Sequence, residues 1–76
     1  MKTEEKIEYY EDGVTIRKRT PYVDDKEHGV QEIYREDGSL GLRIPYVDGV
    51  KHGIEESYRA DGTIHKRTTY VDGKKQ

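Results

Sequence analysis

The nine residues PYVDGVKHG, at positions 45–53, decide the fold because the chain repeats them with small changes. PYVDDKEHG occupies residues 21–29, and TYVDGKKQ occupies residues 69–76. Asp-Gly in such a stretch is a strong β-hairpin signal, because both central residues of a type I′ turn need positive φ. The stretch therefore predicts a reversal of the chain, and its recurrence predicts the same reversal in each of three units.

A constant spacing sets these stretches in register. Tyr22, Tyr46 and Tyr70 are 24 residues apart (46 − 22 and 70 − 46). A fixed period of this length is typical of proteins built from stacked structural repeats. We interpret residues 1–76 as a single domain. Its three units cover roughly residues 5–29, 30–53 and 54–76.

Each unit also contains an earlier turn signal, Asp12-Gly13, Asp37-Gly38 or Asp61-Gly62. The runs between the turns are rich in Tyr, Val, Ile and Thr that alternate with charged residues, a pattern typical of β-strands. No apolar stripe persists at helical spacing. The sequence predicts an all-β protein, a single-layer twisted antiparallel meander of about three β-hairpins with six or seven strands.

The earlier turns predict which residues face each other across each hairpin. We expect two-residue turns at Asp37-Gly38 and Asp61-Gly62, and a four-residue loop at residues 12–15 in the first unit. Opposite charges then meet across the strands, which favours this register. The predicted pairs are Glu8 with Arg19, Glu32 with Arg43, and Glu56 with Arg67.

The alternation of a strand divides the side chains between two faces of the sheet. On one face we expect the aliphatic residues Ile16, Ile33, Leu40, Leu42, Ile44 and Ile64 with the column Tyr22, Tyr46 and Tyr70. On the other we expect the columns Tyr10, Tyr34 and Tyr58, and Arg19, Arg43 and Arg67.

The composition and charge of the chain limit the locations and the kinds of partner that we expect. Only 30% of the residues are hydrophobic and 39% are charged, with a net charge of −2. This composition would also suit a disordered chain, but the repeated turns and strands argue against that alternative. There is no cysteine and no apolar run long enough for a membrane span, and the polar stretch MKTEEKIEYYEDG predicts no signal peptide, so we expect a cytoplasmic protein. Direct binding to nucleic acid or to a membrane is not expected, because the basic residues alternate with acidic ones.

No motif predicts catalysis, a cofactor or a metal. His28, His52 and His65 lack a fixed third ligand for zinc. An acid–base pair would need two carboxyl groups in a cleft, which a flat sheet does not offer. The Tyr and Arg columns could stack bases and hold phosphates, but the opposed glutamates would neutralise the arginines.

The recurring pattern Y-x-x-D-G, then Y-V-D-G-K/V-x-H-G, resembles the MORN-repeat family, and more closely its bacterial variant. The resemblance covers roughly residues 9–73. It implies hairpin repeats in an elongated antiparallel sheet and, for the bacterial variants, an antitoxin or immunity-type role beside a toxin. Asp25 replaces the turn glycine of the first unit, and the third unit reaches Gln76 without a His-Gly pair.

The sequence and the resemblance together predict a small non-enzymatic protein-binding module of bacterial or phage type. It would be a stoichiometric inhibitor that covers a surface of a toxin or of a nucleic-acid enzyme. The alternatives are a self-assembling module, for example a homodimer, and a phospholipid-binding module. The predicted partner-binding residues are Tyr10, Tyr22, Tyr34, Tyr46, Tyr58, Tyr70, Arg19, Arg43, Arg67, Glu36, Asp37 and Asp61.

Overall fold

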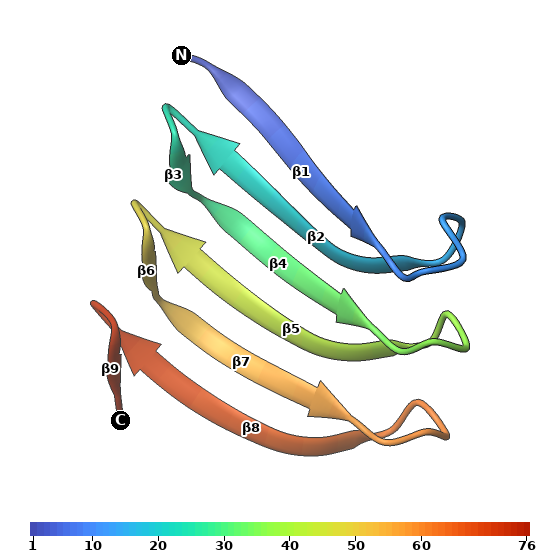
Figure 1. The fold of residues 1–76 in the computed structure, drawn as a ribbon. Helices are drawn as coiled ribbons and strands as arrows, with labels where there is room; N and C mark the ends of the chain where they lie inside the picture. The colour runs from blue at the N-terminus through green and yellow to red at the C-terminus, as the bar shows by residue number, and fades with distance from the viewer.

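The computed structural model describes residues 1–76 as nine strands in one open antiparallel sheet, with no helix (Figure 1). The strands are β1 (Thr3–Tyr9), β2 (Ile16–Val23), β3 (Lys26–Glu27), β4 (Gly29–Tyr34), β5 (Leu40–Val47), β6 (Val50–Lys51), β7 (Gly53–Tyr58), β8 (Ile64–Val71) and β9 (Lys74–Lys75). All nine strands belong to this one sheet, so the molecule, which measures 32 × 29 × 14 Å, has a single layer. The predicted fold class is confirmed. Six strands are long, and three strands of two residues bring the total above the six or seven expected.

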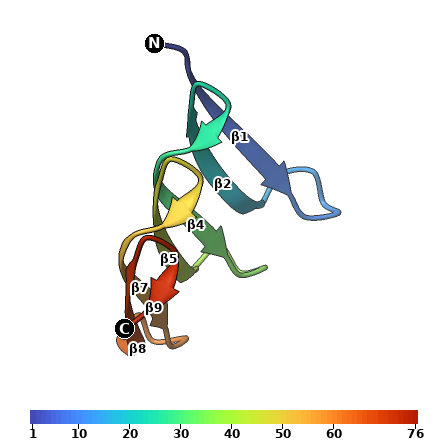
Figure 2. The same cartoon turned by 90° about the vertical axis from the view of Figure 1, so that its left-hand side faces the viewer.

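The long strands form three hairpins side by side, β1–β2, β4–β5 and β7–β8. The short strands β3, β6 and β9 each fold back on the end of the preceding long strand, at the same end of the sheet (Figures 1 and 2). The chain therefore passes from one hairpin to the next through a two-residue turn and a two-residue strand.

These connecting turns have the predicted type I′ conformation. Asp48 and Gly49 have φ of 48° and 88°, and Asp72 and Gly73 have φ of 50° and 84°. The turn of the first unit is the same, because Asp24 and Asp25 have φ of 50° and 68°. Aspartate tolerates the left-handed region better than most residues, so Asp25 can stand where the other units have glycine.

The turns within the hairpins differ from the prediction. Gly38 N donates to Arg35 O (2.9 Å), Arg35 N donates to Ser39 O (2.8 Å), and only Gly38 in this loop has positive φ. The loop is therefore a type I turn followed by a left-handed glycine, not a two-residue type I′ turn. The loop of the third hairpin has the same bonds from Gly62 and Arg59.

The predicted register nevertheless holds in the second and third hairpins, because a bulge offsets the extra loop residue. Tyr34 faces Leu40 but Ile33 faces Leu42, which leaves Gly41 without an opposite residue. Glu32 consequently faces Arg43, as predicted. The third hairpin repeats this arrangement: Glu56 faces Arg67, as predicted, and His65 is the extra residue, so Tyr58 faces Ile64 and not His65.

In the first hairpin the predicted register is wrong by one residue. The loop covers residues 11–14, because Tyr10 N donates to Thr15 O (2.9 Å), and a bulge follows between Tyr9 and Glu8. Glu8 therefore faces Lys18, and Arg19 faces Ile7. The four-residue loop lies one position earlier than expected, which shifts the opposed residue by two, and the bulge then restores one of these two positions.

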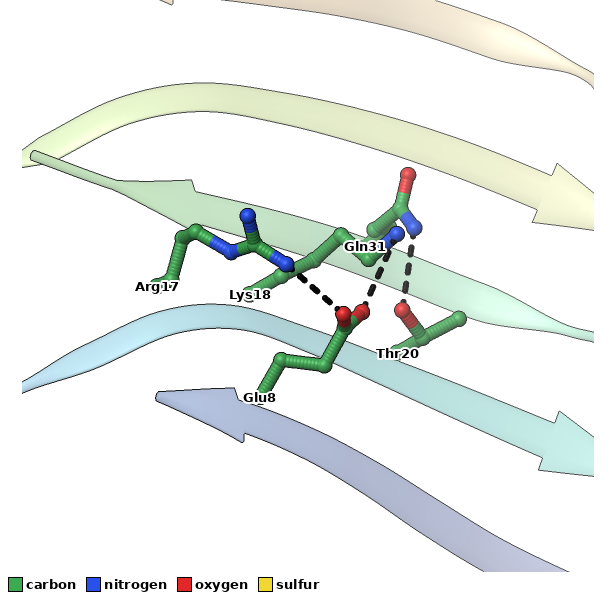
Figure 3. A network of polar contacts seen from close by, with 5 residues as sticks. All are labelled: Glu8, Arg17, Lys18, Thr20 and Gln31. Carbon is green, nitrogen blue, oxygen red and sulfur yellow. Dashed lines mark hydrogen bonds and ion pairs between the residues drawn. The ribbon is translucent and has the colours of Figure 1, made fainter. Parts of the chain in front are cut away.

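Three residues form the buried centre of the sheet, Thr20 (2% exposed), Ile44 (6%) and Gln31 (7%). They lie on one face, because Gln31 faces Ile44 and Thr20 is its neighbour on β2. Gln31 Nε2 donates to Thr20 Oγ1 over 2.9 Å, so the most buried polar groups satisfy each other (Figure 3).

The register defines two faces of the sheet, which we call the tyrosine face and the arginine face. The tyrosine face carries this centre together with Ile33, Leu42, Tyr22, Tyr46 and Tyr70. The arginine face carries Arg19, Arg43, Arg67, Glu32, Glu56, Tyr34, Tyr58, Val30 and Ile54. The predicted division is correct for these residues. Ile16, Leu40 and Ile64 were expected on the tyrosine face, but they lie opposite Tyr9, Tyr34 and Tyr58 because of the bulges.

Gly29 and Gly53 form the corners at which the chain leaves a short strand for the next long one. Their φ values are 116° and 119°, in a region that side chains rarely adopt. A Cβ on Gly53 would also lie 3.0 Å from Cγ of Pro45, and one on Gly29 equally close to Cγ of Pro21. The recurring His-Gly pairs therefore mark a close approach of the backbone to a proline ring of the preceding long strand.

Candidate interaction surfaces

The arginine face has a central guanidinium that lacks a carboxylate partner. Arg67 Nε lies 2.9 Å from Glu56 Oε2. Arg19 Nε lies 3.3 Å from Glu5 Oε1, a contact whose geometry falls short of a hydrogen bond. Arg43 faces Glu32 and Glu56 across the strands, yet it forms no ion pair, and its buried Nε has no hydrogen-bond partner.

The two carboxylates that Arg43 faces accept hydrogen bonds from tyrosine hydroxyls instead. Tyr34 OH donates to Glu32 Oε1 (3.0 Å), and Tyr58 OH donates to Glu56 Oε1 (3.2 Å). Burial, and then the Glu32 carboxylate, raise the pKa of Tyr34, so this phenol stays protonated and remains a donor. The predicted ladder of Glu–Arg ion pairs is thus realised in the third hairpin but not in the second.

Tyr10 does not belong to the column that was predicted for it. Tyr9, Tyr34 and Tyr58 are the last residues of β1, β4 and β7, whereas Tyr10 lies one residue beyond β1. The extra residue in the first loop causes this offset. Tyr10 OH instead donates to the backbone oxygen of Tyr34 in the next hairpin, over 2.6 Å.

We call Tyr10, Arg35 and Arg59 the strap residues, because each closes a loop through its own N–H and precedes an x-Asp-Gly sequence. Arg35 Nη2 donates to the backbone oxygen of Tyr58, just as Tyr10 OH donates to that of Tyr34. Arg59 donates only within its own hairpin, to Thr63 Oγ1 (3.3 Å) and Ile64 O (3.0 Å). The sequence prediction missed these contacts; the shared position before x-Asp-Gly is the signal that could have found them.

The tyrosine face has a cation above one of its rings. Lys51 Nζ lies 4.8 Å from the centroid of the Tyr70 ring and 2.9 Å from Glu55 Oε1. Burial is the main cause that raises the pKa of Tyr46. The contact between Lys51 of β6 and Tyr70 of β8 therefore adds to the cohesion between the second and third hairpins.

A row of acidic loops lines one end of the sheet (Figure 1). We call Glu11, Asp12, Glu36, Asp37 and Asp61 the acidic loop row. Asp37 Oδ1 accepts from Ser39 N (2.8 Å), and Asp61 Oδ1 accepts from Thr63 N (2.9 Å). Hydrogen bonds from Ser39 and from Thr63 lower the pKa of these two carboxyl groups, which are therefore ionised at neutral pH.

The acidic loop row also borders a hollow between the first and second hairpins. Tyr10, Glu11, Asp12 and Glu36 line this hollow, whose volume is about 350 Å³. Hydrogen bonds from Thr15 and from the Val14 amide lower the pKa of Asp12. The predicted residues Glu36, Asp37 and Asp61 thus lie together at one end of the sheet, away from the Arg19, Arg43 and Arg67 column.

A second polar network lies over the tyrosine face near β1 (Figure 3). Glu8 Oε1 lies 2.8 Å from Arg17 Nη2, and Glu8 Oε2 lies 3.2 Å from Lys18 Nζ. Hydrogen bonds from Lys18 and then Arg17 lower the pKa of Glu8. Glu8 therefore has two cationic partners in place of the predicted Arg19.

Two of the three histidines, His28 and His52, contact connecting turns. His28 Nδ1 accepts from Asp48 N (3.5 Å), and His52 Nδ1 accepts from Asp72 N (3.3 Å). Each histidine thus contacts the connecting turn of the following hairpin. No group of three His, Cys, Asp or Glu side chains is arranged to hold a metal ion. The structure also has no helix that could cross a membrane.

Comparisons of this chain with models of protein families, with curated proteins and with solved structures give no match.

Proposed function

We propose that this protein is a small non-enzymatic binding module that inhibits a protein partner by covering its functional surface. The single observation that carries the proposal is the uncovered arginine face of a one-layer sheet. Only three of the 76 residues are buried, and the large side chains Val30 and Ile54 on this face are 37% and 52% exposed. A surface of this kind gains free energy when a partner covers it.

The residue types on the arginine face suit a protein interface. Tyrosine and arginine are enriched in interfaces and in their energetic centres. Arg43 offers a guanidinium without an ion pair, at the middle of the sheet, to a carboxylate or carbonyl of the partner. Strand pairing on both sides of β5 holds the Arg43 backbone in place, so little conformational freedom remains to be lost on binding.

The resemblance to MORN-repeat proteins supports a partner of the toxin or nucleic-acid-enzyme class, as in an antitoxin or immunity protein of bacterial or phage type. Nucleic-acid enzymes carry basic surfaces, and the acidic loop row is complementary in charge to such a surface. Cysteine is absent, so the proposal includes a cytoplasmic location.

The test uses a partner identified by the neighbouring gene or by capture from the native host. Titration of that partner with this protein is expected to abolish its activity at one copy per partner. Ile54→Glu places a charge on the arginine face without touching the buried centre, and we expect it to weaken inhibition at least tenfold. The reason is that burying an unpaired carboxylate at an interface costs several kcal/mol.

Val14→Glu is the matched control, because Val14 is 77% exposed and lies in the first loop, away from the arginine face. It introduces the same charge beside Asp12 of the acidic loop row, which would face a basic partner, and is therefore expected to inhibit at least as strongly as the original chain. Equal inhibition by the Ile54→Glu and Val14→Glu variants would refute the arginine face as the contact. A partner that is bound but keeps its full activity would refute inhibition by covering.

A further inference from the structure

The sheet has two edge strands, β1, whose outer side is uncovered, and β8, whose outer side is covered by β9 at one end only. β1 forms one edge of the sheet. At the other edge β8 pairs with β9 only through Tyr70 and Val71, so the outer side of Lys66 and Arg67 has no neighbouring strand. The matching parts of β2 and β5 each pair there with the next hairpin.

Two observations reflect this missing neighbour: the side chains of β8 at this position are more exposed than those of β2, and one strap residue makes no contact with a further hairpin. Lys66 and Arg67 are exposed, whereas Lys18 and Arg19, at the matching positions of β2, are half-buried. Arg35 is half-buried and donates to the Tyr58 carbonyl of the next hairpin. Arg59, the third strap residue, is exposed and reaches no further hairpin.

We propose that a second copy of this chain docks its β1 against the outer side of β8, with the strand pairing that Lys18 and Arg19 of β2 make with β4 within one chain. This inference is independent of the proposed inhibitor function. It commits to a head-to-tail contact, in which one copy contributes its last long strand and the other contributes its first strand.

The register of this contact follows from the two joints present in the chain, which are the pairings of β2 with β4 and of β5 with β7. Lys66 lies two residues after the start of β8, as Lys18 does in β2. Glu8 lies one residue before the end of β1, as Ile33 does in β4. Since Lys18 faces Ile33 in the first joint, Lys66 faces Glu8 of the second copy. Oppositely charged side chains thus meet where the joint within the chain pairs Lys18 with an aliphatic residue.

Charge complementarity favours this pairing over contacts between like edges. Residues 3–12 carry five carboxylates and one lysine, a net charge of −4. Residues 64–75 carry four basic residues and one aspartate, a net charge of +3 with His65 neutral. Two β1 edges repel each other, as do two β8 edges, whereas β1 attracts β8.

The head-to-tail contact also supplies the acceptor that Arg59 lacks. Tyr9 ends β1 as Tyr34 ends β4 and Tyr58 ends β7, so its backbone oxygen lies at the matching position. Arg59 of one copy then donates to the Tyr9 oxygen of the next copy, as Tyr10 and Arg35 do between the hairpins of one chain.

A contact between unlike edges leaves a free β1 and a free β8 on every assembly. The mean mass measured by sedimentation equilibrium is therefore expected to keep rising with protein concentration, from micromolar to millimolar, beyond that of a dimer. It is expected to fall when salt is added, because the contact is between exposed charges. A mass that stays at one copy over this range, or that levels off at two copies, would overturn the proposal.

The decisive variant is Lys66→Glu, because Lys66 forms no ion pair within its own chain. Its association is expected to be about fivefold weaker at low salt, since an exposed pair becomes a repulsion. Lys26→Glu, at an exposed lysine of β3, is the matched control and is expected to associate like the original chain. Equal association of the two variants would overturn the proposed register.

Reversal of the partner charge gives a second, independent readout. Glu8→Lys weakens association, and the double variant with Lys66→Glu and Glu8→Lys is expected to recover it, because opposite charges face each other again. Far-UV circular dichroism checks that each variant is folded, since Glu8 also binds Arg17 and Lys18. A folded double variant that associates no better than Lys66→Glu alone would contradict the pairing of these two residues.

Discussion

Replacement of Gly53 by alanine tests how the hairpins are joined. The structure gives this glycine a φ of 119°, and a Cβ there would lie 3.0 Å from Cγ and 3.3 Å from Cβ of Pro45. A side chain in such a backbone conformation costs about 1 to 3 kcal/mol. Contact with a rigid proline ring costs about 1 to 3 kcal/mol more. The expected loss of unfolding free energy is therefore about 2 to 6 kcal/mol.

This loss is large for a chain of this size. A protein of 76 residues is stabilised by about 4 to 11 kcal/mol in total, from about 0.05 to 0.15 kcal/mol per residue. A sheet with three buried residues belongs near the lower limit. Urea unfolding followed by far-UV circular dichroism is expected to show a midpoint about 2 M lower for Gly53→Ala, or no folded baseline at all.

Gly49→Ala provides the matched control, because Gly49 also has positive φ (88°) but no atom within 4 Å of the added Cβ. It removes backbone freedom without the contact to proline, so its cost is expected to be about 1 to 2 kcal/mol. Pro45→Ala, introduced together with Gly53→Ala, is expected to recover the part of the lost unfolding free energy that is due to contact with the proline ring. The reasoning would be refuted by equal losses for Gly49→Ala and Gly53→Ala together with no recovery from Pro45→Ala.

Other substitutions test the buried centre, the loops and the contact surface. Thr20→Val leaves the Gln31 amide without its partner and is expected to cost about 1 to 3 kcal/mol in urea unfolding, whereas combining it with Gln31→Leu recovers most of that loss. The pKa of Asp61 is lowered in the folded protein, so its contribution to stability is present above the pKa of the unfolded chain and is lost as pH falls through the folded value. The unfolding free energy of Asp61→Asn is therefore expected to decline less steeply below about pH 4 when it is measured by acid titration. Replacing Glu11 and Glu36 by glutamine is expected to slow association with a basic partner in stopped-flow measurements, with a smaller effect at high salt; an unchanged rate would exclude steering by the acidic loop row.

Local chemistry was enough to predict the long strands, the type I′ connecting turns and the Glu–Arg positions of two hairpins. The reason is that positive φ at Asp-Gly and alternation along a strand are properties of neighbouring residues. The three-residue loops were not predicted, because Asp37 favours its own turn by accepting from the Ser39 amide and hydroxyl. The bulge at Gly41 then restores the register, and this compensation arises only once both strands are paired.

Two features of the surfaces and the core also lay beyond the sequence pattern. Thr20 and Gln31 are polar, so nothing in their type predicts that they are the centre of the sheet; their burial depends on neighbours from the first and second hairpins. The strap bonds of Tyr10 and Arg35 reach backbone oxygens 24 and 23 residues away. Any residue offers a backbone oxygen, so side-chain types alone do not reveal the acceptor.

Every strand of this sheet makes its substantial contacts with its immediate neighbours only. The free energy of such a protein is close to a sum of unit terms and joint terms, as in other linear arrays. Duplication of residues 30–53 would add one unit and one joint, each already present in the chain, and would leave all other contacts unchanged. The number of hairpins is therefore a quantity that gene duplication can change in whole steps, and each step is expected to raise thermal stability.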